Sequence, residues 1–180
     1  MTTYLLAGGG TAGHVNPLLA LAAEIRSREP DSVIFALGTE EGLESRLVPE
    51  AGFELVTVEK LPFPRKLNKY AITFPARYAK SVSQVRELIR SRSVNVVVGF
   101  GGYASAPAYE AAKAERVPVV IHEANALPGM ANRRAAKFAS AVAVAFAGTG
   151  LPNAKLIGMP LRAEIVDLLK NADVAAARKH

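Results

Sequence analysis

Short apolar runs alternate along this chain with longer stretches in which apolar residues recur at helical spacing. The short runs are rich in Val, Ile and Leu, as expected of strands that are buried on both faces of a parallel sheet. Seven strands are predicted, over residues 3–7, 32–37, 53–58, 94–98, 117–121, 141–145 and 154–157. Helices are predicted between them, over residues 16–28, 42–51, 75–92, 106–114 and 130–138. This alternation indicates an α/β fold with a Rossmann-like, doubly wound parallel sheet.

A glycine cluster follows the first predicted strand. Residues 8–14 have the sequence GGGTAGH, and Asn16-Pro17 then predicts the start of a helix, with Asn as N-cap and Pro in the first position. Glycines let backbone N–H groups form a concave cradle, and a helix N-terminus adds partial positive charge, so the loop is typical of phosphate binding. A tight turn is the simpler alternative. His14 ends the cluster, where an imidazole could act as an acid or base.

Two further loops of unusual composition follow later strands. Residues 99–107 form a second glycine cluster, with Ser105 as the expected N-cap of the next helix, and residues 122–132 carry several polar side chains. Ligands of doubly wound sheets bind beyond the carboxyl ends of the strands, so we expect all three loops on one rim. The alternatives are a core histidine for His122, an ion pair or structural hydrogen bond for Glu123, and a turn for Asn125.

The composition argues against several classes of protein. The chain has 180 residues and no cysteine, which excludes disulfides and thiolate metal sites, and its three histidines do not predict a zinc site. We therefore expect no metal site. No run of about 18 apolar residues predicts a membrane span. Residues 1–4 lack the basic region of a secretory signal, so we expect a cytoplasmic protein.

Positive charge is concentrated in one part of the chain. The formal net charge is +6, and between Lys60 and Arg92 nine basic residues stand against one acid, Glu87. That stretch therefore carries +8 and the rest of the chain −2. A local patch of this kind weakens a general nucleic-acid interpretation, and we expect no nucleic-acid partner.

Within the basic stretch, residues 61–74 interleave apolar and aromatic side chains with cations and contain no acid. This composition predicts contact with a membrane surface, with apolar residues in the headgroup boundary and cations against anionic lipid. The expected apolar contacts are Phe63, Leu67, Tyr70, Ile72 and Phe74, and the expected cations are Arg65, Lys66, Lys69, Arg77 and Lys80. A solvated helix face is the alternative.

A literal G-x-G-x-x-G pattern at Gly8, Gly10 and Gly13 would suggest a nicotinamide or flavin enzyme. That fingerprint requires an acidic residue about 20 positions later, at the tip of the second strand. Glu40 comes only after Gly38 and Thr39, and the pattern does not explain the other two loops. A dinucleotide-dependent oxidoreductase domain is therefore the second interpretation.

Taken together, five motifs resemble the N-terminal domain of the MurG family, which belongs to glycosyltransferase family 28. The motifs are GGGTAGHVNPLLALA (8–22), LGTEEGLESRLVPEAGFE (37–54), VVGFGGYASAPA (97–108), PVVIHEANALPGMANRRAAKFA (118–139) and GMPLR (158–162). Their order and spacing agree with the family over about residues 3–165.

The resemblance implies a two-domain GT-B fold and a role in peptidoglycan synthesis. Members transfer N-acetylglucosamine from UDP-N-acetylglucosamine to the 4-hydroxyl of undecaprenyl-diphosphoryl-N-acetylmuramyl-pentapeptide, at the cytoplasmic face of the bacterial membrane and its anionic lipids. They do so without a bound metal, and we expect no cofactor. It further implies that residues 1–160 are the acceptor-binding domain, that 161–180 begin the interdomain segment, and that the C-terminal donor domain is missing. The chain alone is then expected to be inactive. A lipid-diphosphate-binding module without turnover is the alternative from another class.

The resemblance also assigns residues. Thr11, Ala12, Gly13, Asn125 and Arg162 match positions that contact the donor from this side, and Tyr103, Ser105 and Glu123 match residues of the acceptor-side loops. Gly101 and Gly102, in the second glycine cluster, are further substrate-binding candidates. His14 matches the histidine proposed as general base, and Glu123 is the second catalytic candidate. Three residues depart from the family pattern, namely Ala12 for Gly, Ala124 for Gln and Met159 for Asn. Ala12 places a methyl group where a diphosphate would approach.

Overall fold

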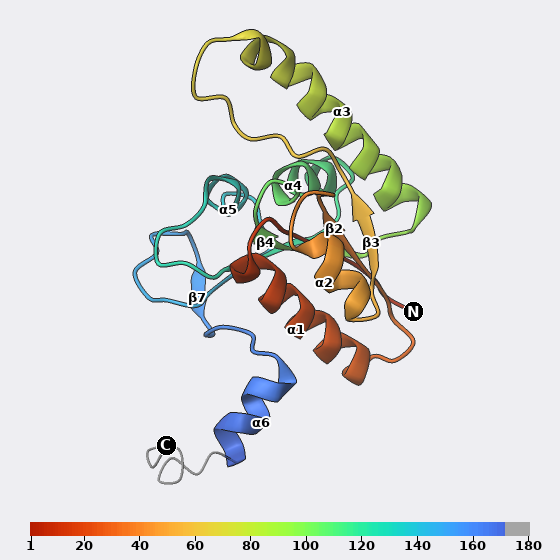
Figure 1. Cartoon of the computed structure of the whole chain (residues 1–180), viewed down its shortest axis with the longest axis vertical. Helices are drawn as coiled ribbons and strands as arrows, with labels where there is room; N and C mark the ends of the chain where they lie inside the picture. Colours follow the sequence, from red (N-terminus) through yellow and green to blue (C-terminus); the bar gives the residue numbers. More distant parts are fainter. Residues whose placement is uncertain (172–180) are drawn as a thin grey trace.

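The computed structural model describes residues 1–171, which form a seven-stranded parallel sheet with helices on both faces (Figure 1). The strands are β1 (Thr3–Gly8), β2 (Val33–Gly38), β3 (Glu54–Thr57), β4 (Val96–Gly101), β5 (Val119–Glu123), β6 (Ala141–Val144) and β7 (Ala154–Leu156). The helices are α1 (Ala12–Arg28), α2 (Glu44–Glu50), α3 (Lys69–Ser91), α4 (Ser105–Ala114), α5 (Met130–Ala135) and α6 (Ala163–Asn171). The predicted fold class and all seven predicted strands are confirmed.

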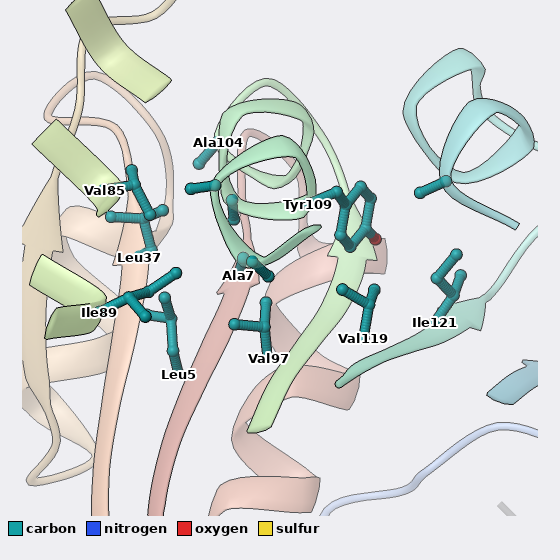
Figure 2. Packing of buried hydrophobic residues seen from close by; sticks show 14 of the residues in the cluster. Leu5, Ala7, Leu37, Val85, Ile89, Val97, Ala104, Tyr109, Val119 and Ile121 are labelled. Carbon is teal, nitrogen blue, oxygen red and sulfur yellow. The ribbon is translucent and has the colours of Figure 1, made fainter. Parts of the chain in front are cut away.

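Successive residues of each strand supply two separate cores, because side chains alternate between the faces of a sheet. Leu5 of β1 packs with Val85 of α3 and Tyr109 of α4 on one face (Figure 2). Its neighbour Leu6 packs with Leu18 of α1 on the other. Each of these buried leucines stabilises the fold by roughly 1.5–3 kcal/mol relative to an exposed one. The two-sided burial explains why the strands are apolar at nearly every position.

The strand order is β3-β2-β1-β4-β5-β6-β7, and every pair is parallel. The order therefore changes direction between β1 and β4. The chain leaves β1 for α1 on one face and leaves β4 for α4 on the other. Such a point opens a crevice at the carboxyl ends of the two strands, where doubly wound folds bind ligands.

Helix α1 begins at Ala12, four residues before the predicted Asn16-Pro17 start. Thr11 holds the N-cap position with an extended backbone, and its carbonyl oxygen accepts from the N–H of His14 at 3.1 Å. Pro17 lies inside the helix, where its missing N–H leaves one carbonyl of the first turn without a helical donor. His14 is thus fixed on a helix rather than in a loop.

Helix α3 begins at Lys69 rather than at the predicted Pro75. The side chain of Asn68 caps it by accepting from the N–H of Ala71 at 3.0 Å, and Pro75 is accommodated in the second turn. Figure 1 shows the preceding loop and the first turns of α3 projecting away from the sheet. Part of the basic stretch is therefore presented on a helix that stands clear of the core.

Two further differences concern helix ends. Ser105 is the first residue of α4 rather than its cap, because Ala104 occupies the N-cap position. Helix α6 lies where the sequence predicted only the start of an interdomain segment, and residues 172–180 of that segment lie outside the described residues. None of the helices within residues 1–171 is long and apolar enough to cross a bilayer.

Candidate active site at the carboxyl edge of the sheet

The first glycine loop leaves the N-terminus of α1 open to solvent. Thr11, Ala12 and Gly13 are exposed, no side chain within residues 1–171 caps the helix, and its first turn contains no acidic residue. The backbone N–H groups and the partial positive charge of the helix can therefore receive an anion such as a diphosphate. Gly10 has a φ of +86°, but its N–H points inward to a buried acceptor. The N–H of Gly10 is therefore not available to a ligand, and fewer backbone N–H groups face the solvent than the sequence predicted.

That buried acceptor is Glu44, the first residue of α2. Its Oε2 accepts from the N–H of Gly10 at 2.7 Å, and its Oε1 accepts from the N–H and hydroxyl of Thr39 at 2.8 and 2.9 Å. Burial raises the pKa of this carboxyl, but the hydrogen bonds, led by that of Gly10, outweigh burial and hold the pKa below its ordinary value. Glu44 therefore anchors the loop as a carboxylate.

The environment of His14 assigns its two ring nitrogens. Nδ1 lies 2.9 Å from the carbonyl oxygen of Gly9 and 3.3 Å from Oγ1 of Thr11. A carbonyl can only accept, so Nδ1 carries the proton and the neutral ring keeps its lone pair on Nε2. Nε2 faces the second glycine loop, since a methyl group added at Gly101 would come within 3.1 Å of it. This geometry suits a base acting on a hydroxyl held between the loops.

The second glycine loop is in contact with the first. Gly101 and Gly102 have φ values of +94° and +89°, which glycine adopts without strain. A Cβ at Gly102 would lie 2.5 Å from the carbonyl oxygen of Gly9, so the approach requires glycine. The buried hydroxyl of Ser105 lies 2.8 Å from carbonyl oxygens at the ends of both β1 and β4. Ser105 therefore joins the two strands, whereas Tyr103 is exposed at the rim.

Glu123 organises the third loop from within. It is buried at the end of β5 and accepts four hydrogen bonds of 2.9–3.0 Å, from the backbone and side chain of Asn125, the N–H of Gly129 and the side chain of Asn132. Tyr109 donates to Oδ1 of Asn132 at 2.6 Å, and burial raises the pKa of its hydroxyl, which stays protonated. These donors give Glu123 a positioning role and leave Asn125 exposed at the rim.

His122, one residue earlier, is packed in the core. Its Nε2 lies 3.0 Å from the carbonyl oxygen of Gly158 and therefore donates to it, and its ring lies 5.9 Å from that of Phe100. Nδ1 is buried without a hydrogen-bond partner among residues 1–171. The arrangement matches the alternative of a core histidine at a strand end.

The structure does not bring Arg162 to the three loops. Arg162 is exposed just before α6 and lines a groove of about 730 Å³ together with Asn16 and Leu19 of α1 and with Phe53. Its expected contact with a donor stays a prediction.

Most side chains of the segment 61–74 are exposed, but Leu61 and Phe74 are buried. Phe63, Leu67 and Ile72 are 54%, 101% and 80% exposed, but Phe74 is only 8% exposed. The ring of Phe74 lies 5.1 Å from that of Phe63 and 5.7 Å from that of Tyr78. The prediction that Phe74 contacts lipid was wrong, because this side chain packs the segment against α3.

Ion pairs neutralise part of the basic stretch. The pairs are Lys60 with Glu41, Arg77 with Glu59, Arg86 and Arg90 with Glu115, and Arg92 with Glu54. These acids lie outside the stretch in the sequence, and the fold brings them to it. Counting charges within the stretch alone therefore overestimated the positive charge of the patch. Arg77 was expected at the lipid surface and is instead paired. Within residues 1–171, Arg65, Lys66, Lys69 and Lys80 form no ion pair.

Two residues that hold the site were missed from the sequence, namely Glu44 and Asn132. In the sequence, Glu44 is one of several acids between residues 40 and 50. The signal that could have found it is the pair of nearby glycines, Gly38 and Gly42, which a solvated acid does not need. Asn132 offered no comparable signal.

Comparison with known proteins gives consistent matches. The family model described as the glycosyltransferase family 28 N-terminal domain matches residues 4–144. Proteins of Clavibacter sepedonicus and Leifsonia xyli subsp. xyli are 60% and 57% identical to this chain over 179 and 178 residues. Both are named "UDP-N-acetylglucosamine--N-acetylmuramyl-(pentapeptide) pyrophosphoryl-undecaprenol N-acetylglucosamine transferase". The alignments cover 99% of this chain and 49% of each relative, so the chain spans about half the length of these relatives.

Solved structures agree on the fold. Acinetobacter baumannii MurG superimposes with a TM-score of 0.76 at 26% identity, over 88% of this chain and 45% of that one. The S. aureus MnaA–UDP co-structure superimposes with a TM-score of 0.60 at 16% identity, over 89% and 44% of the two chains. At that identity the second match supports the architecture alone.

Proposed function

The chain belongs to the glycosyltransferase family 28 N-terminal domain family, and from this premise we propose that it is the acceptor-binding half of an N-acetylglucosaminyltransferase. The proposed donor is UDP-N-acetylglucosamine, and the proposed acceptor is N-acetylmuramyl-(pentapeptide) pyrophosphoryl-undecaprenol, as in the names of the relatives. One observation carries the proposal. Nδ1 of His14 is bonded to the carbonyl oxygen of Gly9, which leaves Nε2 where two glycine loops meet, beside the open N-terminus of α1.

In the proposed reaction, Nε2 of His14 accepts the proton of the 4-hydroxyl of the muramyl sugar. The hydroxyl oxygen forms a bond to the anomeric carbon of N-acetylglucosamine, and UDP leaves with the electron pair of the broken bond. Attack on the face opposite UDP inverts the anomeric configuration. The backbone N–H groups of Thr11, Ala12 and Gly13, which are exposed, and the positive end of α1 stabilise diphosphate charge at this rim.

We propose that a second domain completes the donor site, because the matched relatives are about twice as long as the region they share with this chain. On this side the donor contacts would be Thr11, Ala12, Gly13, Asn125 and Arg162. Gly101, Gly102 and Tyr103 would face the acceptor, and Ser105 and Glu123 would hold their loops in place. By itself the chain is then expected to bind UDP-N-acetylglucosamine weakly and to transfer no sugar.

The proposal is tested by transfer of radiolabelled N-acetylglucosamine to an acceptor with a shortened polyprenyl chain. The proteins compared are the chain alone and the chain fused to the second half of the Clavibacter sepedonicus relative, which is 60% identical in the shared half. Transfer by the fusion but not by the chain alone is the expected result. A folded fusion that binds both UDP and acceptor and forms no disaccharide contradicts the proposal.

We also propose that segment 61–74 attaches this half of the enzyme to anionic lipid at the cytoplasmic face of the bacterial membrane. Exposed Phe63, Leu67 and Ile72 would enter the headgroup boundary while Lys66 and Lys69 meet lipid phosphates. Each cation near such a surface contributes roughly 1 kcal/mol, so the attachment is peripheral and reversible. An acceptor anchored by a polyprenyl chain requires this proximity.

A further inference from the structure

One peptide group links the buried carboxylate to the imidazole. We propose that Glu44 is a positioning residue for His14 and that it acts through the peptide group between Gly9 and Gly10. The N–H of this group donates to Oε2 of Glu44 at 2.7 Å, and its carbonyl oxygen accepts from Nδ1 of His14 at 2.9 Å. The inference rests on the proposed function for the role of Nε2 as base. The hydrogen-bonded link from Glu44 through this peptide group to His14, called the relay below, is independent of it.

The geometry of a peptide group explains how the relay transmits an effect. The N–H and C=O of a trans peptide point in opposite directions within one plane, so bonds at both ends fix the orientation of the plane. The bond of 2.7 Å to Glu44 is short for an N–H donor, as charge-assisted hydrogen bonds are. A negative charge at the N–H end shifts electron density toward the carbonyl oxygen and makes it a stronger acceptor. Glu44 thereby strengthens the bond that keeps the proton of His14 on Nδ1.

The chain makes room for this carboxylate at three separate positions. A Cβ added at Gly9, Gly38 or Gly42 would lie 2.1–2.3 Å from side-chain atoms of Glu44. Within residues 1–171 the carboxylate has no ion-pair partner, so its charge is balanced by N–H and O–H donors alone. A buried charge costs stability that an apolar side chain would not. At the base of the glycine loop, this charge fixes the loop by accepting the hydrogen bond from the N–H of Gly10.

The consequence for the site is the identity of the free nitrogen. With Nδ1 protonated and bonded to Gly9, the lone pair of His14 is on Nε2, at the contact with Gly101. Once Nε2 takes a proton, the same carbonyl and the charge behind it stabilise the imidazolium. A weaker relay leaves the ring free to rotate or to exchange tautomers. For part of the time, Nε2 then carries the proton or points elsewhere and cannot act as the base.

The first test measures the tautomer in the 180-residue chain by ¹⁵N NMR of the imidazole above its titration. In the wild type the neutral ring of His14 should carry its proton on Nδ1. Glu44→Gln keeps the size of the side chain, and the two donors of Thr39 should hold its single oxygen, which turns the amide NH₂ toward the N–H of Gly10. The Nδ1–H fraction should then fall. A folded Glu44→Gln variant with an unchanged tautomer overturns the proposal.

Thr39→Val is the matched control. It removes the hydrogen bond from the Thr39 hydroxyl to Oε1 of Glu44 and leaves the bond between Oε2 and the N–H of Gly10 intact. This control should lose stability without changing the tautomer, and an equal change in both variants would assign the effect to general loosening. A measurement on the wild type covers the case in which Glu44→Gln does not fold. Couplings across hydrogen bonds should connect Gly10 N with the carboxyl carbon of Glu44, and Nδ1 of His14 with the carbonyl carbon of Gly9. Absence of either coupling contradicts the relay.

The second test is kinetic and uses the two-domain fusion. Glu44→Gln should lower kcat about 10- to 100-fold, the size of the loss when a hydrogen-bond partner that orients a metal-bound histidine is removed, with little change in KM for the donor. Thr39→Val, which keeps the bond between Glu44 and Gly10, should lower kcat less than Glu44→Gln does. A wild-type fusion without transferase activity would refute the proposed function and leave the tautomer result standing. An active Glu44→Gln fusion with unchanged kcat would refute the relay alone.

Discussion

The rim of three loops and the segment 61–74 are built in opposite ways. At the rim, the buried carboxylates of Glu44 and Glu123 accept hydrogen bonds from both backbone and side-chain donors, and the outcome is the placement of a single atom, Nε2 of His14. In the segment, apolar side chains and cations stand in solvent and act by exposure. A single substitution at the rim is therefore expected to abolish its function, whereas each substitution in the segment should weaken membrane binding by a small, additive amount.

The largest expected effect is at the rim. In the two-domain fusion, His14→Ala should lower kcat about 10²- to 10⁴-fold, because removal of a general base typically costs that much. Transfer of labelled sugar at saturating acceptor measures it, and the unfolding midpoint of the isolated chain checks that the fold is intact. Near-normal turnover by the variant would remove His14 from the mechanism and erase the contrast with the segment.

A difference within the segment comes next in size. Phe74→Ala should lower the free energy of unfolding by about 3–5 kcal/mol, since it empties a buried aromatic site. Leu67→Ala should leave stability unchanged and reduce vesicle binding instead, because Leu67 is fully exposed. Urea unfolding and vesicle co-sedimentation of both variants decide the matter. Equal losses of stability would mean that Leu67 is also packed.

A smaller effect is expected from the cations. Lys66→Glu with Lys69→Glu should weaken binding to anionic vesicles by at least about 2 kcal/mol, or roughly 30-fold, since each cation contributes roughly 1 kcal/mol. Lys137→Glu with Lys155→Glu is the control, with the same change in net charge at exposed sites elsewhere. Higher salt should weaken wild-type binding as the Debye length shortens. Equal binding to neutral vesicles, or equal losses in both pairs, would argue against a membrane-facing segment.

The smallest effect concerns acid stability at the rim. Burial alone would raise the pKa of Glu44, but its hydrogen bonds hold the pKa below the ordinary value of 4.5. Its carboxylate therefore stabilises the folded state above that value, and the contribution is lost as pH falls through the folded pKa. Below about pH 4.5 the free energy of unfolding of the wild type should fall more steeply than that of Glu44→Gln. Parallel pH profiles from urea unfolding would contradict the assigned environment.

Much of the fold could be predicted from the sequence, because buried parallel strands leave a direct signal in apolar runs. Helix starts were harder. The Asn16-Pro17 and Pro75 signals suggested starts at those residues, but Thr11 and Asn68 already occupy the N-cap positions, and a proline in an early turn is tolerated. Local propensity does not decide between two such starts, and tertiary packing does.

The candidate site could be predicted in part. Glycine loops and His14 are local patterns, so their place on one rim followed from the strand order. The roles of Ser105 and Glu44 depend on residues far away in the sequence, with Ser105 reaching a carbonyl 98 positions earlier and Glu44 an N–H 34 positions earlier. Such hydrogen-bond partners are brought together by the fold, and no spacing in the sequence predicts them.

The most direct test of the central claim is an NMR titration of the ¹⁵N-labelled chain with a muramyl-pentapeptide diphosphate that carries a short, soluble prenyl chain. We expect the backbone amides of Ala12, Gly13, Gly101 and Gly102 and the His14 imidazole to shift, and residues 61–74 to be unaffected by this soluble acceptor. Saturable binding that leaves those amides and the imidazole unchanged, or shifts confined to residues 61–74, would contradict the central claim.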